Sequence, residues 1–359
     1  MTATVVPPSS ILQLLLLLTI CTSGPVLRPT STTTTPVYRA SIVKAWPHAT
    51  TSFTEGFGFI PRSLLHEATM PVVYESTGLY TKNTSSSIRL SNYRTNSIIL
   101  HRELPRGSFA EGSTLVGGVL FVGSLSSNQM FTFEATTLQP LPLSVVRLPP
   151  QGPLHSWGLT TDPSTDLLYV SDGSSEIHIV SINTQGESVH VGSINVHDGD
   201  TPIRELNELE FVEGLIYANI LGRSCIAKIL PETGDVVGWL SFEAALKKWP
   251  SVGTNEVLLR QMNGIAYDSF SKVLLVTGKL WPFVFEIQEG VPIIDGQSVK
   301  DTVACKPSRE VDYKHAHLGL NNRLPLIPFP TAESVRKNYP EYTANSMLLH
   351  NVPSDGTAT

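Results

Sequence analysis

The sequence predicts an all-β protein, a five-bladed β-propeller with an N-terminal signal and linker and a C-terminal extension. Short apolar strands recur along the chain, and 26 Pro and 26 Gly provide for many turns. Five units of similar plan follow one another, and their spacing is close to that of four-stranded propeller blades. The units open with short motifs that begin at Thr54, Ala110, Ser156, Asn207 and Met262.

The first residues differ in composition from the rest of the chain. The apolar block from Ile11 to Ile20, followed by small residues, predicts a signal peptide or an uncleaved signal anchor over residues 1–24. We therefore expect a protein of the secretory pathway, secreted or lumenal. The apolar block is shorter than the roughly 20 residues that a helix needs to cross a bilayer. Residues 25–37 are rich in Thr and Pro and are predicted to be a linker.

The predicted propeller domain covers residues 38–290. Residues 38–46 alternate well enough to form a strand, which is expected to join the last unit and close the ring, so that no sheet edge is left free. Each unit opening leads into a first strand, a turn and a second, apolar strand. The second strands are expected at residues 72–75, 119–122, 167–170, 215–218 and 273–276, and clear third strands at 177–180 and 226–229.

Outside the repeated strands, two segments have helical spacing. Residues 241–249 are predicted to form a helix between the fourth and fifth units, and residues 331–339 are helix-like. The strand pattern fades after about residue 290. Residues 291–359 are therefore expected to be an extension of the domain, partly disordered.

Two cysteines remain once the signal is set aside. Cys225 and Cys305 could pair and hold the C-terminal extension to the body, or stay as two free thiols, and the sequence leaves both alternatives open. Asn83 begins an Asn-Thr-Ser sequon and is predicted to be an exposed glycosylation site.

The charge of the chain excludes some partners. The formal net charge is -6, the isoelectric point is near 5.9, and Lys and Arg are scattered. Neither nucleic acid nor a membrane is an expected partner, unless the N-terminal segment is an uncleaved anchor. We expect a monomer.

The unit openings predict a functional site. In a propeller the innermost strands run along a central channel, so their ends meet although they are far apart in sequence. Taken singly, each residue there has an ordinary explanation as a rim charge, a core residue or a turn former. Their equivalent positions favour a shared small-ligand site. It would collect Glu55, Glu111, Trp157, Asn207, Asn263 and Lys279, with Phe53 and Phe109 close by.

Familiar metal and nucleophile motifs are missing from the sequence, including H-E-x-x-H, C-x-x-C, G-x-S-x-G and the P-loop. His315 and His317 are the one close histidine pair. Asp172 and Asp268 could ligate a structural calcium, although an aspartate in such a turn usually caps it. Three further glutamates are expected to be surface charges rather than a metal cluster: Glu205, Glu208 and Glu210.

An ordered series of motifs extends over about residues 40–288. It comprises FTEG at 53–56, YESTGLY at 74–80, FAEG at 109–112, WGLT at 157–160, SDG at 171–173, LNELE at 206–210, YAN at 217–219, NGIAYD at 263–268 and VTGKLWP at 276–282. Together these motifs resemble the plant and bacterial type of glutaminyl cyclase. That resemblance implies a five-bladed propeller enzyme that converts the N-terminal glutamine of peptides and proteins to pyroglutamate, releases ammonia and needs no cofactor for catalysis.

The resemblance also implies roles for individual residues. Glu111 would be the catalytic acid/base and Lys279 its electrostatic helper. Asn207 and Trp157 would bind the substrate. Glu55 and Asn263 are predicted to bind the substrate as well, from their positions at the unit openings. The apolar walls would be Phe53 and Phe109.

Three positions depart from the family pattern. Glu55 stands where the family commonly has Gln, Ala110 where it has Gly, and Leu221 where it usually has Trp. These departures bear on substrate affinity and side-chain preference. They motivate an alternative function, a non-catalytic peptide-binding propeller derived from this family. A metal-dependent propeller hydrolase is a third hypothesis, for which the sequence offers no evident ligand set.

Overall fold

The structure is a computed structural model. It describes residues 35–65, 70–78, 85–125, 128–150, 152–153, 155–183, 186–253, 255, 258, 261–292 and 305. The chain divides into a unit of residues 1–34, outside the described residues, and a unit of residues 35–359, to which all that follows refers. The predicted signal segment, Asn83, the His315–His317 pair and the helix at 331–339 also lie outside the described residues.

The described chain is built almost entirely of β-strands, which confirms the predicted all-β class. Three antiparallel sheets have four strands each, in sequence order. The first contains β2 (Thr54–Phe59), β3 (Val72–Thr77), β4 (Ser87–Asn92) and β5 (Ser97–Glu103). The second contains β6 (Ala110–Val116), β7 (Val119–Ser124), β8 (Gln129–Glu134) and β9 (Pro140–Arg147). The third contains β10 (Gly158–Asp162), β11 (Leu167–Ser171), β12 (Glu176–Ile182) and β13 (Ser188–Asn195).

The fourth sheet has eight strands and joins two further arrays through β1 (Val37–Pro47). One array contains β16 (Leu206–Val212), β17 (Leu215–Ile220), β18 (Cys225–Ile229) and β19 (Val236–Ser241). The other contains β20 (Met262–Asp268), β21 (Val273–Gly278) and β22 (Phe283–Pro292). A small hairpin of β14 (His197–Asp198) and β15 (Thr201–Pro202) precedes β16, and a short 3-10 helix, η1 (Arg62–Leu64), follows β2.

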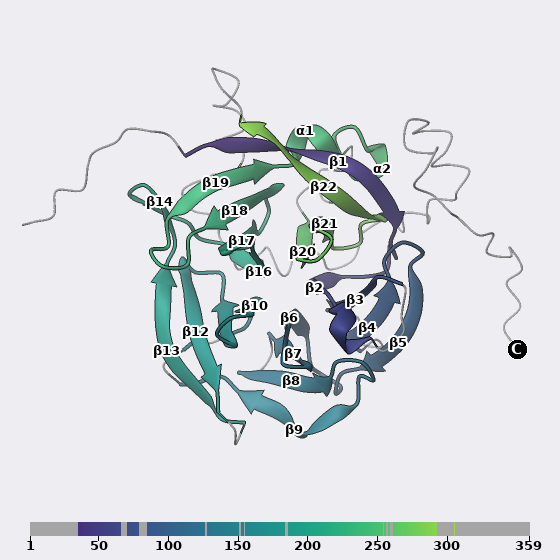
Figure 1. The fold of residues 1–359 in the computed structure, drawn as a ribbon, viewed down its shortest axis with the longest axis vertical. Helices are drawn as coiled ribbons and strands as arrows, with labels where there is room; N and C mark the ends of the chain where they lie inside the picture. Colours follow the sequence, from purple (N-terminus) through teal and green to yellow (C-terminus); the bar gives the residue numbers. More distant parts are fainter. Residues whose placement is uncertain are drawn as a thin grey trace, which may run out of the picture. The chain divides into compact units, whose positions relative to one another are not determined.

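The sheets are arranged around a common centre, and the first strand of each array lies innermost (Figure 1). Strand β2 contacts both β6 and β20, β10 contacts both β6 and β16, and β16 contacts β20. The five innermost strands therefore form a closed ring of neighbours. This closure brings the five unit openings together, although they are separated by dozens of residues.

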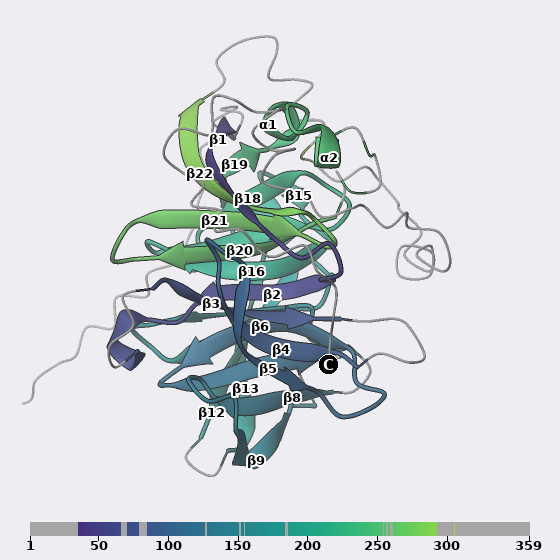
Figure 2. The same cartoon turned by 90° about the vertical axis from the view of Figure 1, so that its right-hand side faces the viewer.

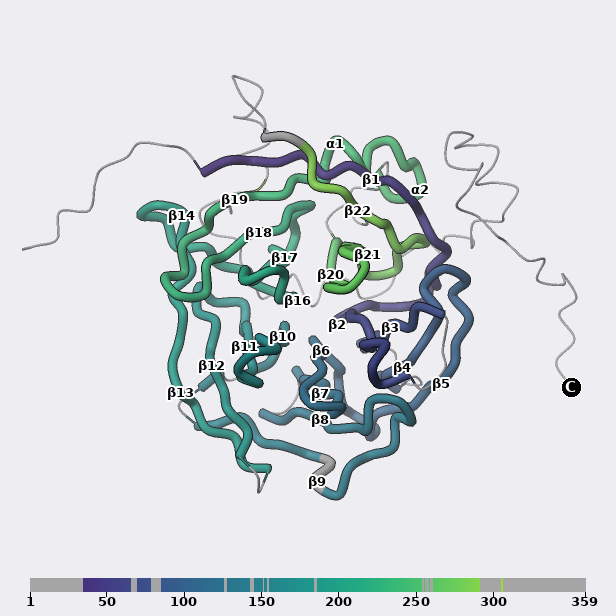
Figure 3. The backbone as a smooth tube through the Cα atoms, viewed as in Figure 1, coloured from purple at the N-terminus to yellow at the C-terminus, as the bar shows by residue number. Residues whose placement is uncertain are grey.

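Strand β1 closes the outer part of the ring, running beside β19 and β22 (Figure 3). It pairs antiparallel with β22 from Tyr38 to Pro47, as predicted, and also parallel with β19. The strand begins at Val37, inside the predicted linker, because Val37 is buried in the core and pairs with Trp239. Strand β22 likewise continues to Pro292, beyond the predicted domain limit.

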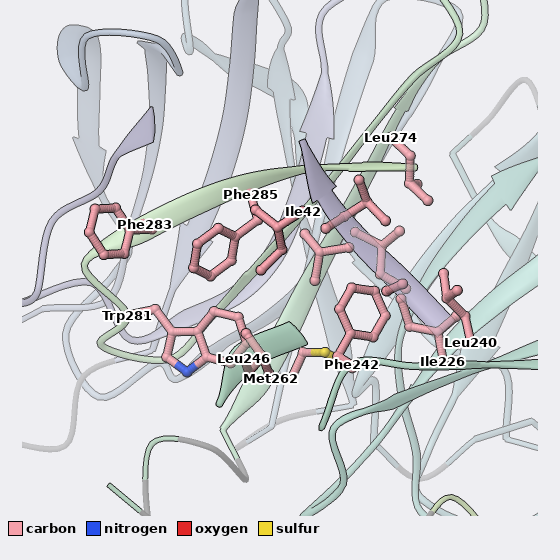
Figure 4. Close-up of a cluster of buried hydrophobic side chains, with 14 of the residues drawn as sticks. Ile42, Ile226, Leu240, Phe242, Leu246, Met262, Leu274, Trp281, Phe283 and Phe285 are labelled. Carbon is pink, nitrogen blue, oxygen red and sulfur yellow. The ribbon is translucent and has the colours of Figure 1, made fainter. Parts of the chain in front are cut away.

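A large apolar core joins β1, β19 and β22, and part of it is drawn in Figure 4. Two short helices, α1 (Glu243–Leu246) and α2 (Pro250–Gly253), lie beside these strands (Figure 2). The predicted helix over 241–249 was therefore too long. Ser241 still belongs to the β19 ladder, where it pairs with Cys225, and Pro250 starts a new helical turn. Phe242 and Leu246, which belong to this segment, are both buried in the core.

Cys225 and Cys305 form a disulfide, so the free-thiol alternative is wrong. Both cysteines are buried, and the bond fixes residue 305 to β18 across 80 residues of sequence. Within the described ranges, no helix is long and apolar enough to cross a membrane.

Candidate active site

The residues predicted to share a site lie at or beside the ends of the inner strands. Glu55 is in β2, Glu111 in β6, Asn207 in β16 and Asn263 in β20, and all four are at most 2% exposed. Trp157 directly precedes β10, and Lys279 directly follows β21; both are also buried. The ring of inner strands thus brings together residues from all five arrays.

A shared backbone irregularity presents four of these side chains. The pairing register shifts between Thr54 and Gly56, Ala110 and Ser113, Leu206 and Leu209, and Met262 and Ile265. A β-bulge at such a shift turns a side chain away from the regular alternation of the strand. The residues inside the four intervals include Glu55, Glu111, Asn207 and Asn263.

Glycines next to the site residues allow the inner strands to approach closely. A Cβ atom on Gly112 would lie 2.6 Å from the Cα atom of Gly158, and one on Gly158 would lie 2.0 Å from the carbonyl oxygen of Asn207. Neither position can therefore hold a larger residue without moving backbone. This close approach places Glu111, Trp157 and Asn207 on adjacent strands.

Glu55 is the centre of the polar group. Its Oε2 accepts a hydrogen bond from Lys279 Nζ at 2.7 Å and another from Asn263 Nδ2 at 3.0 Å. Asn263 Nδ2 also donates to the carbonyl oxygen of Thr54 at 3.1 Å. The site therefore contains a buried ion pair that is held by a carboxamide.

Burial and mutual repulsion set the protonation of the two carboxyl groups. Burial raises the pKa of Glu55 to about 7, against the opposing effect of the Lys279 ammonium. Burial, and then the negative charge of Glu55, raise the pKa of Glu111 well above its ordinary value, and Lys279 again opposes the rise. Because Lys279 pairs directly with Glu55, we assign the negative charge to Glu55 and the proton to Glu111.

Aromatic side chains border the charged group. Lys279 Nζ lies 4.7 Å from the centroid of the Phe53 ring, within range of a cation–π interaction. Phe53 packs edge-to-face against Phe109, with ring centroids 6.3 Å apart. Both phenylalanines are buried, so the ion pair has an apolar border on this side.

Trp157 and Asn207 join this group through their backbones. The carbonyl oxygen of Trp157 accepts from Gly112 N at 3.0 Å, next to Glu111, and Trp157 N donates to the carbonyl oxygen of Ser171 at 2.8 Å. The hydroxyl of Ser171 in turn donates to the carbonyl oxygen of Asn207 at 2.6 Å. The buried Oδ1 atoms of Asn207 and Asn263 accept no hydrogen bond from the described residues. Each is therefore a free acceptor at the site.

A second buried ionic group, which the sequence did not reveal, is centred on Glu75 and lies next to the site. Glu75 Oε1 accepts from Thr54 Oγ1 at 2.8 Å and from His48 Nε2 at 3.1 Å, and Glu75 Oε2 accepts from Arg89 Nε at 2.8 Å. His48 Nδ1 lies 2.8 Å from the carbonyl oxygen of Trp281. Both ring nitrogens of His48 therefore lie beside hydrogen-bond acceptors.

The Glu75 group fixes the backbone on both sides of the Glu55–Lys279 pair. Thr54 immediately precedes Glu55, and Trp281 lies two residues after Lys279. Burial alone would raise the pKa of Glu75, but Arg89, His48 and the hydrogen bonds lower it to about 2. The one indication in the sequence was a charged residue within the otherwise uncharged segment 72–77.

Other predicted positions are structural. Glu208 is completely buried rather than a surface charge, because its two oxygens accept from Phe57 N at 3.3 Å and Ile265 N at 2.9 Å and so bridge three inner strands. Asp172 and Asp268 cap their own turns by accepting from the backbone N–H groups two residues ahead. Among the described residues, no group of three His, Cys, Asp or Glu is placed to hold a metal ion.

Comparisons with known proteins agree on one family. The sequence model of the glutamine cyclotransferase family matches residues 14–289. A glutaminyl-peptide cyclotransferase from Arabidopsis thaliana is 32% identical over 248 residues, which is 69% of this chain and 70% of that protein. The crystal structure of Myxococcus xanthus glutaminyl cyclase superimposes with a TM-score of 0.57 at 27% identity, and the match covers 72% of this chain and 99% of that one.

Proposed function

The chain belongs to the glutamine cyclotransferase family, and we infer from this that it is a glutaminyl-peptide cyclotransferase. It converts the N-terminal glutamine of peptides and proteins to pyroglutamate and releases ammonia. The non-catalytic alternative is not favoured, because Glu111, Lys279 and Asn207 are all kept at one site. Ala110, which departs from the family pattern, is fully buried in the core, so its methyl group is accommodated by the surrounding side chains.

The mechanism is supported by one observation: the carboxyl groups of Glu55 and Glu111 and the ammonium of Lys279 are buried together. The α-amine of the substrate attacks the γ-carboxamide carbon, a C–N bond forms, and the bond to the departing nitrogen breaks. Protonated Glu111 gives its proton to the departing nitrogen, which leaves as ammonia. The ring nitrogen then loses its extra proton to Glu111, so the enzyme is restored.

The remaining residues position the substrate and balance charge. Lys279 lies where it can stabilise negative charge on the substrate oxygen during ring closure. The free Oδ1 atoms of Asn207 and Asn263 can accept hydrogen bonds from the α-amine, which directs its lone pair at the carbonyl carbon. Phe53 and Phe109 exclude water from one side. In this mechanism protons are moved by side chains alone, and no metal takes part.

Replacing Glu111 with Gln tests the assignment. The variant keeps the shape of the side chain but cannot transfer a proton, so kcat on a glutamine-initiated peptide should fall by about 10²- to 10⁴-fold. Ammonia release and the mass of the product measure the reaction. Glu213→Gln is the matched control, because Glu213 is an exposed carboxylate paired with Lys272 at 2.7 Å, away from the site.

A Glu111→Gln protein with near wild-type kcat would remove Glu111 from the mechanism. Thermal unfolding of both variants shows whether a loss of activity reflects a loss of fold. A wild-type protein that releases no ammonia from any glutamine-initiated peptide would contradict the proposed function itself.

We propose that the closed ring of inner strands is a five-bladed β-propeller that acts as a monomer. We propose that residues 1–24 direct the chain into the secretory pathway and that Asn83 carries a glycan. The disulfide between Cys225 and Cys305 supports an oxidising compartment, where such bonds persist.

A further inference from the structure

The inference rests on the proposed function and begins with the free edges of the inner strands. Strands β2, β16 and β20 each stand at the end of the strand order in their sheet, so each pairs with a sheet neighbour on one side only. The N–H groups on the other side need acceptors from elsewhere, because a buried N–H without a partner is costly. Side chains of β16 and β17 provide such acceptors where β2 and β20 present site residues.

Glu208 of β16 holds the backbone at two bulges with one carboxyl group. Its Oε1 accepts from Phe57 N at 3.3 Å, two residues after Glu55. Its Oε2 accepts from Ile265 N at 2.9 Å, two residues after Asn263. Each donor lies at or directly after the end of the register shift that presents the site residue. One side chain therefore fixes the backbone where both bulges end.

Asn219 of β17 fastens the bulge of β20 at a neighbouring residue. Its Oδ1 accepts from Gly264 N at 3.0 Å, directly after Asn263. Gly264 has a φ angle of 123°, which a residue with a Cβ atom rarely adopts. Asn219 is completely buried, and its Nδ2 has no hydrogen-bond partner among the described residues. The described hydrogen bonding of this side chain is thus directed to the bulge.

The two bulges also contact each other at the site. Asn263 Nδ2 donates to the carbonyl oxygen of Thr54 at 3.1 Å and to Glu55 Oε2 at 3.0 Å. The same Oε2 accepts from Lys279 Nζ. A displacement of either bulge would therefore move the ion pair, and a misplacement of about 1 Å can reduce a rate by about 10²-fold.

Stability alone does not explain a carboxyl group at position 208. Glu208 is completely buried, and burial, followed by the negative charge of Glu210, raises its pKa well above the ordinary value. The hydrogen bonds from Phe57 N and Ile265 N oppose this rise. An apolar side chain of similar volume would avoid the cost of burying the carboxyl, but it could not accept from the two N–H groups. The carboxyl group supplies those two acceptors at the bulges.

We propose that Glu208 and Asn219 are positioning residues of the reaction. They act through the backbone of β2 and β20, whose bulges they hold, and so set where Glu55 and Asn263 stand at the site. Loss of these acceptors would leave the fold in place but loosen the site.

Glu208→Gln and Glu210→Gln form a matched pair on one strand. The amide at position 208 has one oxygen for two N–H groups, so one bulge loses its acceptor. Glu210 Oε1 accepts from Tyr267 N at 2.8 Å, beyond the bulge, and an amide oxygen can keep that bond. On a glutamine-initiated peptide, kcat/KM should fall at least about tenfold in Glu208→Gln, with KM raised at least about threefold, and stay within about twofold in Glu210→Gln.

The KM value separates positioning from a loss of fold. Partial unfolding lowers the concentration of active enzyme, and with it the maximal rate, but leaves KM unchanged. Thermal unfolding of each variant measures the stability independently. A Glu208→Gln protein that is less stable than the wild type and yet keeps the wild-type KM overturns the proposal.

Asn219→Ala provides the test if Glu208→Gln does not fold. It removes one described hydrogen bond, at the bulge of β20, so KM should rise at least about threefold. A folded Asn219→Ala protein with the wild-type KM overturns the proposal. The proposed function fails separately, when the wild type releases no ammonia from the glutamine peptide.

Discussion

Replacement of Glu75 by Gln is expected to destabilise the protein by an amount that follows from its surroundings. The carboxylate has a pKa of about 2 in the folded chain against an ordinary value of 4.5. At about 1.4 kcal/mol per pKa unit, this difference stabilises the fold by roughly 3 kcal/mol at pH 7. Removing one partner of a buried ionic group typically costs about 3–5 kcal/mol, which agrees with this value.

The pH dependence of the effect has a definite sign. The folded pKa of Glu75 lies below the unfolded one, so its contribution is complete above about pH 5 and is lost as the pH falls toward 2. Only about 2 kcal/mol of it remains at pH 3.5. The difference in unfolding free energy between the wild type and Glu75→Gln should therefore be smaller at pH 3.5 than at pH 7.

Urea unfolding followed by tryptophan fluorescence at the two pH values measures this difference. Glu134→Gln is a suitable control, because Glu134 is mostly solvated although hydrogen bonds from Thr136 and Thr137 lower its pKa. It should change stability little. A Glu75→Gln protein that loses less than about 1 kcal/mol, or the same amount at both pH values, would refute the assigned ionic network.

Two further predictions concern the disulfide and metal dependence. Cys305→Ser opens a loop of 80 residues; the loop-entropy relation gives about 4.5 kcal/mol for this length, so Tm should fall by on the order of 10 °C in calorimetry. An unchanged Tm would mean that the bond does not constrain the unfolded chain. Dialysis against a chelator should leave ammonia release from a glutamine peptide unchanged, and a complete loss that zinc reverses would contradict the side-chain mechanism.

Much of the strand arrangement could be predicted because the repeated openings carry a periodic signal. The apolar segments at 119–122 and 273–276 fall inside β7 and β21, and the expected closing strand pairs as β1 with β22. Convergence of Glu55 and Lys279 was predicted because the ends of the inner strands meet at a common centre when the ring closes. Their ion pair itself was not predicted, because a contact across 224 residues depends on atomic positions that a repeat does not specify.

What the sequence did not reveal are interactions whose partners are unrelated in sequence. Glu75, Arg89 and His48 come from different segments, and each alone has the composition of a surface residue. Glu208 was taken for a surface charge for the same reason, although its carboxylate replaces missing backbone partners between strands. The β-bulges also escaped prediction, since one extra residue in a strand leaves the hydrophobic pattern nearly unchanged.

The pairing of β1 with β19 and β22 has a consequence for how the molecule is made. During synthesis the strand at Val37–Pro47 is made before the other described strands, yet its two partners, β19 and β22, are among the last of them. Until then its backbone donors and acceptors have no native partner, and the nascent arrays present an open sheet edge to other chains. A chain released before β22 is translated would keep that edge, so aggregation of truncated products should report on this late step.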